Sequence, residues 1–102
     1  MTRVRSSLVA ALAAVLTVVV APPPAQAAAP TYVALGDSYA SGTGTRSYIA
    51  DGTSCQRSTS AYPSLIAAAS GYALNFRACS GARIADVTNT QLSALTATTS
   101  YV

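Results

Sequence analysis

The chain has 102 residues, a formal net charge of +3, no histidine and two cysteines, and 51% of its residues are hydrophobic. A chain of this length holds one domain at most. Residues 28–102 carry four arginines against three aspartates, so their net charge is only +1. Because no basic cluster is present to grip a phosphate backbone, we predict no nucleic-acid partner.

Residues 1–27 have the pattern of a secretory signal peptide. A short basic region opens the chain, an apolar run covers residues 8–21, and Ala25-Gln26-Ala27 matches a small-residue cleavage pattern. An uncleaved membrane anchor is the alternative, but a span needs about 18 or more apolar residues, and a proline run ends this one early. We expect cleavage after Ala27, a secreted protein without a stable membrane anchor, and a domain over residues 28–102.

The two cysteines, Cys55 and Cys79, are expected to form a disulfide, because the chain is directed to an oxidising compartment. Closing this loop should stabilise the fold by about 3.5 kcal/mol in the chain-entropy model. A nucleophilic or metal-binding thiol is the alternative, but the chain has no histidine, and two sulfurs alone do not make a zinc site. We therefore predict no metal site and no cofactor.

The pattern in the first half of residues 28–102 predicts a strand, a loop and a helix. The apolar run at 31–35 is typical of a strand buried on both faces, and residues 41–60 are rich in Gly, Ser and Thr, as loops are. A helix should follow and end at Gly71. Its signals are the helical spacing of four apolar residues, an N-cap and a first-turn proline: Tyr62, Leu65, Ile66 and Ala69, with Ser60 and Pro63.

The second half predicts a strand at 72–78 and a helix at about 82–95. The strand should place Tyr72, Leu74, Phe76 and Ala78 on one face, and the helix should bury Ile84, Val87, Leu92 and Leu95. Residues 100–102 can open a third strand. Alternating strands and helices favour an α/β fold with a parallel sheet and helices on its faces, of which the chain would hold only a part.

Two polar turns follow the two predicted strands. Gly36-Asp37-Ser38 comes after the first strand, and Cys79-Ser80-Gly81-Ala82 comes after the second. Because the carboxyl ends of parallel strands share one edge of the sheet, we expect the two turns to converge. A serine hydroxyl and backbone N–H groups at such an edge suit acyl transfer, with the N–H groups of Ser38 and Gly81 stabilising an oxyanion.

The segments YVALGDSYASG at 32–42 and ACSGA at 78–82 resemble the nucleophile and glycine blocks of secreted bacterial SGNH hydrolases, the GDSL-like esterases and lipases, of the actinobacterial type. The resemblance covers residues 31–102 and implies the N-terminal part of a three-layer α/β/α, flavodoxin-like fold. It implies that Ser38 is the nucleophile and that Ser38 and Gly81 donate to the oxyanion. Gly36 and Asp37 belong to the motif, with Asp37 ordering the turn rather than acting as the triad acid.

Two blocks of that family are absent: the Gly-x-Asn-Asp segment, which supplies a third oxyanion donor, and the Asp-x-x-His segment, which supplies the base. A serine without a positioned base is a poor nucleophile, so we expect this chain to be inactive alone. The expected substrate is a small-molecule or lipid ester, with Tyr39 and Tyr48 either lining an acyl pocket or packing within the domain. The alternative is a small secreted, disulfide-bonded module without catalysis, which binds or supports another molecule.

Overall fold

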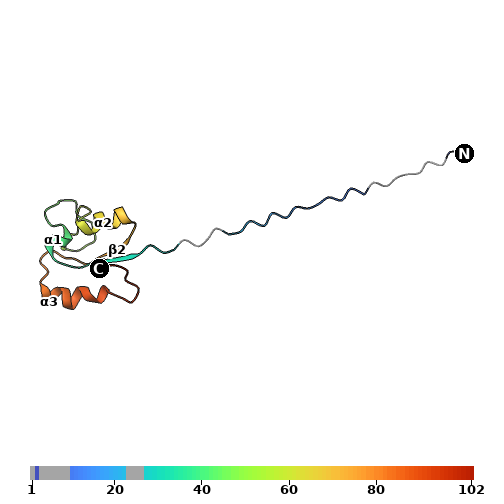
Figure 1. The fold of residues 1–102 in the computed structure, drawn as a ribbon. Coiled ribbons are helices and arrows are strands. Elements are labelled where there is room, and N and C mark those ends of the chain that lie inside the picture. Colours follow the sequence, from blue (N-terminus) through green and yellow to red (C-terminus); the bar gives the residue numbers. More distant parts are fainter. Residues whose placement is uncertain (1, 3–9, 23–26) are drawn as a thin grey trace.

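The computed structural model describes residues 2, 10–22 and 27–102. Its elements occur in the order β1 (Thr31–Ala34), α1 (Ser38–Ser41), α2 (Tyr62–Ser70), β2 (Ala73–Phe76), α3 (Ile84–Asp86), η1 (Val87–Gln91) and η2 (Leu92–Ala94). The last three form one continuous helical segment. The two strands lie between α2 on one side and this helical segment on the other, as an α/β fold requires (Figure 1).

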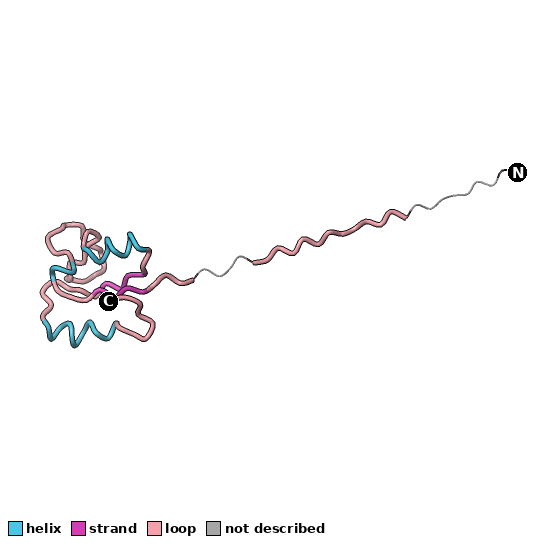
Figure 2. Tube along the Cα trace, viewed as in Figure 1, coloured by secondary structure: helices cyan, strands magenta, loops and turns pink. Residues whose placement is uncertain are grey.

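Strand β1 is hydrogen-bonded along both of its edges. It pairs in parallel with β2, with Thr31 opposite Ala73 and Ala34 opposite Phe76. On its other edge, the Val33 N–H donates to the Tyr101 carbonyl at 2.9 Å, and the Tyr101 N–H donates to the Thr31 carbonyl at 2.9 Å. The end of the chain therefore returns to the strands, where Figure 2 shows the C-terminus beside them. The predicted third strand is present as this single bridge.

A small core lies between the strands and α2. Tyr32 and Ala34 of β1 meet Ala67 of α2, and partly buried side chains of the second strand region pack against them, namely Tyr72, Leu74 and Phe76. These are residues of the face predicted for the second strand, so that prediction is confirmed. Val33 points to the opposite face of the sheet and is also buried.

The helix predicted after the loop is confirmed, but its buried face is not the predicted one. Pro63 and Ala67 are buried, whereas Leu65 and Ile66 are exposed. The N-cap is Ala61 rather than Ser60, because the Ser60 hydroxyl is hydrogen-bonded to Ser47. The N-cap Ala61 is buried against Gly42, which ends α1.

The second predicted helix also differs in the face it buries. Ile84 and Leu92 were expected inside but are exposed, whereas Val87 and Leu95 are half-buried. Gln91 is buried instead. Val87, Gln91 and Leu95 follow one another at intervals of four residues, which places them on the same side of the helix. The turn Val87–Gln91 is π-helical, with the Leu92 N–H donating to the Val87 carbonyl.

The predicted signal peptide is described only in part. Residues 10–22 are described without helix or strand and are exposed, whereas residues 1, 3–9 and 23–26 are outside the described residues. Part of the predicted cleavage pattern, Ala25 and Gln26, is among these. Within the described residues, no helix combines the length and apolarity needed to cross a membrane.

Candidate active site

The turn after β1 holds Ser38 at the start of α1. Gly36 has a φ of +138°, and a Cβ on it would lie 2.8 Å from the Cβ of Ala40, so only glycine fits this position. Asp37 is the N-cap of α1, and its carboxylate accepts a hydrogen bond from the Tyr39 N–H at 3.0 Å. This bond is of the kind that orders a helix start.

Ser38 itself is half-buried. Neither its hydroxyl nor its N–H is hydrogen-bonded to any of the described residues, although its carbonyl accepts bonds from the segment that follows. The hydroxyl is thus available to a substrate, and the N–H is available to an anion.

The turn after β2, which carries Gly81, also has a backbone N–H group without a hydrogen-bond partner among the described residues. It begins at the fully buried Ala78 and closes with the Ala82 N–H donating to the Cys79 carbonyl at 3.1 Å. Gly81 has a φ of +84°, which favours glycine, yet a Cβ there would meet no atom within 4 Å. The conformation of this turn, rather than crowding, therefore explains the glycine. Within the described part of the chain, the Gly81 N–H has no hydrogen-bond partner.

The two turns meet at the same edge of the sheet, as expected from the sequence. The Cys79 N–H donates to the Gly36 carbonyl at 3.1 Å, and the N–H groups of Arg77 and Ala78 both donate to the Ala34 carbonyl. This contact joins the turn of Ser38 to the turn of Gly81 through their neighbours. Among the described residues, no hydrogen bond joins Ser38 and Gly81 directly.

Sequence reasoning missed Gln91, which also reaches this junction. The Gly36 N–H donates to Gln91 Oε1 at 2.8 Å, and Gln91 Nε2 donates back to the Gly36 carbonyl at 2.9 Å. Gln91 is only 3% exposed, and both ends of its side-chain amide are paired. A polar residue midway between Val87 and Leu95 on the buried face is the signal that could have found it, because buried polar groups need partners.

The predicted disulfide between Cys55 and Cys79 is confirmed, with the two Cα atoms 4.2 Å apart. It ties the long loop to the turn that carries Gly81. The Ser80 N–H donates to the Cys55 carbonyl at 2.9 Å, and Arg57 Nε donates to the Ala78 carbonyl at 2.8 Å. The loop is therefore held to the end of β2 by covalent and polar contacts together.

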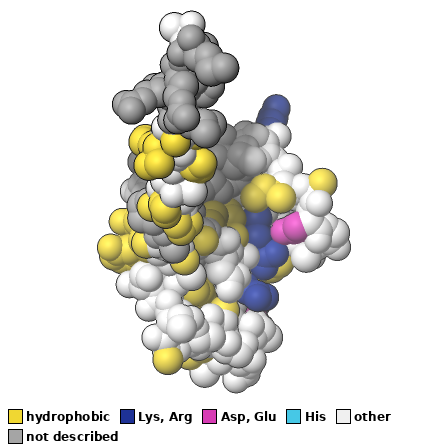
Figure 3. Space-filling view, turned by 90° about the vertical axis from the view of Figure 1, so that its right-hand side faces the viewer, with side chains coloured by type: hydrophobic (Ala, Val, Ile, Leu, Met, Phe, Trp, Pro, Cys, Tyr) yellow, Lys and Arg dark blue, Asp and Glu magenta, His cyan; other side chains and the backbone are white. Residues whose placement is uncertain are grey.

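Arg57 also pairs with Asp51 within the loop, at 3.0 Å between Nη1 and Oδ2. Hydrogen bonds from the Thr53 hydroxyl and N–H, together with the Arg57 guanidinium, lower the pKa of Asp51 to about 2. Figure 3 shows an acidic side chain beside basic ones on the face it presents. The ion pair belongs to the loop scaffold and not to the serine turn.

The two tyrosines considered for an acyl pocket have different environments. Tyr39 is 85% exposed, and its ring centroid lies 6.2 Å from that of Tyr62. The Tyr48 hydroxyl accepts a hydrogen bond from the Gly44 N–H at 2.8 Å, so this side chain braces the loop. Neither tyrosine lines the two cavities described next.

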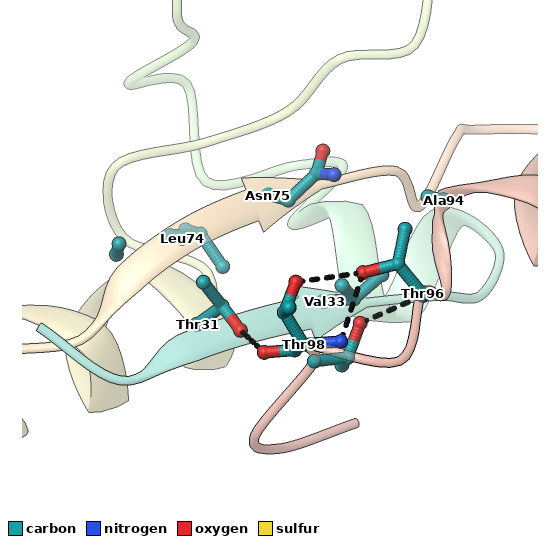
Figure 4. Close-up of a pocket in the computed structure, with 9 residues that line it drawn as sticks. Thr31, Val33, Leu74, Asn75, Ala94, Thr96 and Thr98 are labelled. Carbon is teal, nitrogen blue, oxygen red and sulfur yellow. Dashed lines mark hydrogen bonds between the residues drawn. The ribbon is translucent and has the colours of Figure 1, made fainter. Parts of the chain in front are cut away.

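A cavity of about 280 Å³ opens beside the Gly81 turn. Its walls come from that turn and from the helical segment: Cys79, Ser80, Gly81, Ala82, Asp86, Thr90 and Gln91. A cavity of about 300 Å³ lies between the strands and residues 94–99 (Figure 4). Threonines in its wall are bonded to the chain itself, with Thr31 Oγ1 donating to the Thr98 carbonyl at 2.8 Å. Only the first cavity adjoins a candidate site residue.

The described residues contain no cluster of three or more histidine, cysteine or carboxylate side chains that could hold a metal ion.

No protein-family model matches the chain. Lipase 1 of Streptomyces coelicolor is 52% identical to it over 99 residues, which make up 95% of this chain and 37% of that lipase. A lipase of Streptomyces rimosus is 52% identical over 75 residues, or 72% of this chain and 28% of that lipase. The chain spans about a third of the length of the curated relatives it matches.

Two crystal structures are similar to the folded part. Phospholipase A1 from Streptomyces albidoflavus is 51% identical, with a TM-score of 0.65 over 71% of this chain and 31% of that one. The extracellular lipase from Streptomyces rimosus is 53% identical, with a TM-score of 0.65 over 70% of this chain and 31% of that one. The predicted α/β fold class is thus confirmed.

These matches define the class of protein. The chain is a homologue of Streptomyces lipases, which are ester hydrolases, and the resemblance stated from its sequence motifs is confirmed.

Proposed function

We propose that this chain supplies the nucleophile and two oxyanion donors of an SGNH-type serine ester hydrolase. The observation that carries the proposal is the pairing of two turns at one sheet edge, each with an N–H group that has no partner among the described residues. These are the N–H groups of Ser38 and Gly81, on turns joined by the bond from Cys79 to Gly36. The homology to lipases supports an ester as the substrate.

In this mechanism Ser38 Oγ attacks the carbonyl carbon of the ester. The hydroxyl proton passes to a base, and the carbonyl oxygen becomes an oxyanion that the N–H groups of Ser38 and Gly81 stabilise. Collapse of the tetrahedral intermediate expels the alcohol and leaves an acyl group on Ser38, which water then removes. The 102 residues contain no histidine, so we propose that the base, and a further oxyanion donor, come from outside them.

Export is part of the proposal. Residues 1–27 act as a signal peptide that is cleaved after Ala27, and the domain over residues 28–102 is extracellular. The disulfide between Cys55 and Cys79 supports an oxidising destination, and one relative is itself called an extracellular lipase. Lipid esters are the proposed substrate class because the relatives are lipases and a phospholipase.

A chimera tests the nucleophile. In this chimera, residues 28–102 replace the matching segment of the Streptomyces rimosus lipase, whose crystal structure shares 53% sequence identity with the chain. The rest of that enzyme can then supply the base. We expect hydrolysis of p-nitrophenyl esters that is abolished by Ser38→Ala, together with labelling by a serine-directed phosphonate. Ser93→Ala is the matched control, because Ser93 is exposed.

The isolated 102-residue chain should hydrolyse the same esters no faster than its Ser38→Ala variant. A folded, secreted chimera that retains turnover after Ser38→Ala would refute the nucleophile. A folded chimera with no activity at all would favour the non-catalytic module.

A further inference from the structure

Gln91 connects the helical segment to the turn that carries the proposed nucleophile. Its side-chain amide and the backbone of Gly36 form two hydrogen bonds, at 2.8 Å and 2.9 Å, in opposite directions. A primary amide offers a donor and an acceptor side by side, which is the pattern needed to pair with both the N–H and the C=O of one residue. Gly36 is two residues before Ser38, and no side chain of its own competes for this contact.

The side chain of the pairing is buried, and the glycine it contacts is half-buried. Gln91 is 3% exposed, so the contact is not screened as a surface hydrogen bond would be. The described residues include no other hydrogen-bond acceptor for the Gly36 N–H, and the Gly36 carbonyl takes a second bond only from the Cys79 N–H. Loss of the Gln91 amide would therefore leave the half-buried Gly36 N–H without a hydrogen-bond partner among the described residues.

The same side chain stands in the wall of the cavity beside Gly81. One residue thus contacts the peptide groups ahead of Ser38 and borders the turn that carries the second proposed oxyanion donor. The π-helical turn that ends at Gln91 places this side chain toward the sheet edge while its neighbour Leu92 stays exposed. Single π-helical turns are found at functional sites more often than elsewhere.

We propose that Gln91 is a positioning residue for the nucleophile turn, which fixes the Gly36 peptide groups and thereby the relative placement of the Ser38 and Gly81 N–H groups. The catalytic part of this inference rests on the proposed ester hydrolase function. The structural part, the pairing of Gln91 with Gly36, does not.

The structural part is tested in the 102-residue chain by NMR of the Gly36 amide. Gln91→Leu keeps the volume of the side chain but removes both hydrogen bonds, so the Gly36 amide proton should shift upfield and exchange at least about 10-fold faster. Leu92→Ala is the matched control on the adjacent, exposed position and should leave the Gly36 amide unchanged. An unchanged Gly36 signal in a folded Gln91→Leu variant would overturn the proposal.

Gln91→Glu provides a rescue that a purely space-filling role would not show. An ionised carboxylate accepts from the Gly36 N–H but cannot donate to its carbonyl, whereas the protonated acid can do both. Burial raises the pKa of such a carboxyl, so the transition should fall above its usual range. The Gly36 signal of Gln91→Glu should move toward that of the wild type as the pH is lowered, and a pH-independent difference would count against the pairing.

The catalytic part is tested in the chimera, after its dependence on Ser38 has been established. Gln91→Leu should lower kcat by about 10- to 100-fold with KM nearly unchanged, because misplaced groups slow the chemical step more than they weaken binding. Leu92→Ala should retain wild-type kcat. An unaltered kcat in Gln91→Leu would overturn the positioning role, whereas loss of the Ser38 dependence itself would overturn the proposed function instead.

Discussion

Gly42 lies so close to Ala61 that a Cβ on Gly42 would stand 2.7 Å from the Cβ of Ala61. The backbone of Gly42, which ends α1, therefore packs closely against the side chains of Ala61, the N-cap of α2, and of Ser58. Gly42 also has a φ of +90° and ends α1, with its N–H donating to the Ser38 carbonyl at 3.1 Å.

This contact predicts that Gly42→Ala strongly destabilises the fold. Left-handed strain of about 1–3 kcal/mol adds to overpacking of about 1–3 kcal/mol, because the crowding atoms include backbone that cannot turn aside. Gly52→Ala is the matched control, since Gly52 has a φ of +75° but open space around its Cβ position. Urea unfolding followed by circular dichroism should show a clearly larger loss for Gly42→Ala. Equal losses would contradict the proposed crowding.

A second prediction concerns the Cys55–Cys79 disulfide. Replacing both cysteines by serine should lower the free energy of unfolding by about 3.5 kcal/mol, because the unfolded chain regains the entropy of an open loop. Reduced wild-type protein should match the double variant. Mass spectrometry of the exported protein after alkylation under non-reducing conditions checks the starting state, and two alkylated thiols there would show that the disulfide does not form.

A third prediction follows from the lowered pKa of Asp51, about 2 in the folded chain. Because the pKa of an unfolded aspartate is about 3.9, the folded state is stabilised above that pH and loses this contribution as the pH falls toward 2. Asp51→Asn should therefore lower stability at neutral pH and flatten the loss between about pH 4 and pH 2. Acid unfolding curves of the two proteins test this.

Thr53→Val separates the causes of that shift. This substitution removes the hydroxyl that donates to Asp51 but keeps the contact with Arg57. The pKa of Asp51 should therefore rise toward its ordinary value. A titration of the Asp51 carboxyl carbon by NMR that is unchanged in Thr53→Val would show that the hydroxyl does not set the pKa.

A fourth prediction addresses Gly81 as an oxyanion donor. In the Ser38-dependent chimera, Gly81→Ala should lower kcat on the order of 10²-fold, because the strained turn would displace the N–H group. Gly71→Ala is the control, since Gly71 has a similar φ of +70° and equally open surroundings at the end of α2. It should lose stability but keep its kcat. Similar kcat values for both variants would exclude Gly81 from catalysis.

The parts of this fold that the sequence predicted depend on local signals. Pro63 and Gly71 bracket α2 because one lacks an N–H that the first turn does not need and the other adopts the left-handed cap. The alternation of Tyr72, Leu74 and Phe76 marked one face of the second strand. The placement of Ser38 and Gly81 after two parallel strands followed from the common direction of those strands.

The parts that the sequence did not predict depend on what each helix packs against. Leu65 and Ile66 are the more hydrophobic choice for a buried face, but it is Ala67 that packs against Tyr32 and Ala34 of β1. Gln91 was overlooked because a polar side chain is normally assigned to the surface. Its burial becomes favourable only when the peptide groups of Gly36, 55 residues earlier in the chain, are in place to pair with it.

The bonds between Thr31, Val33 and Tyr101 have a consequence for the order of folding. Tyr101 lies far from β1 in the sequence, so the second edge of β1 is covered only after α2, β2 and the helical segment have been made and residue 101 has returned to the strand. Contacts of such long sequence separation form late and slow the search for the native state. The strand that leads to the candidate nucleophile is therefore made before each of the described elements that enclose it.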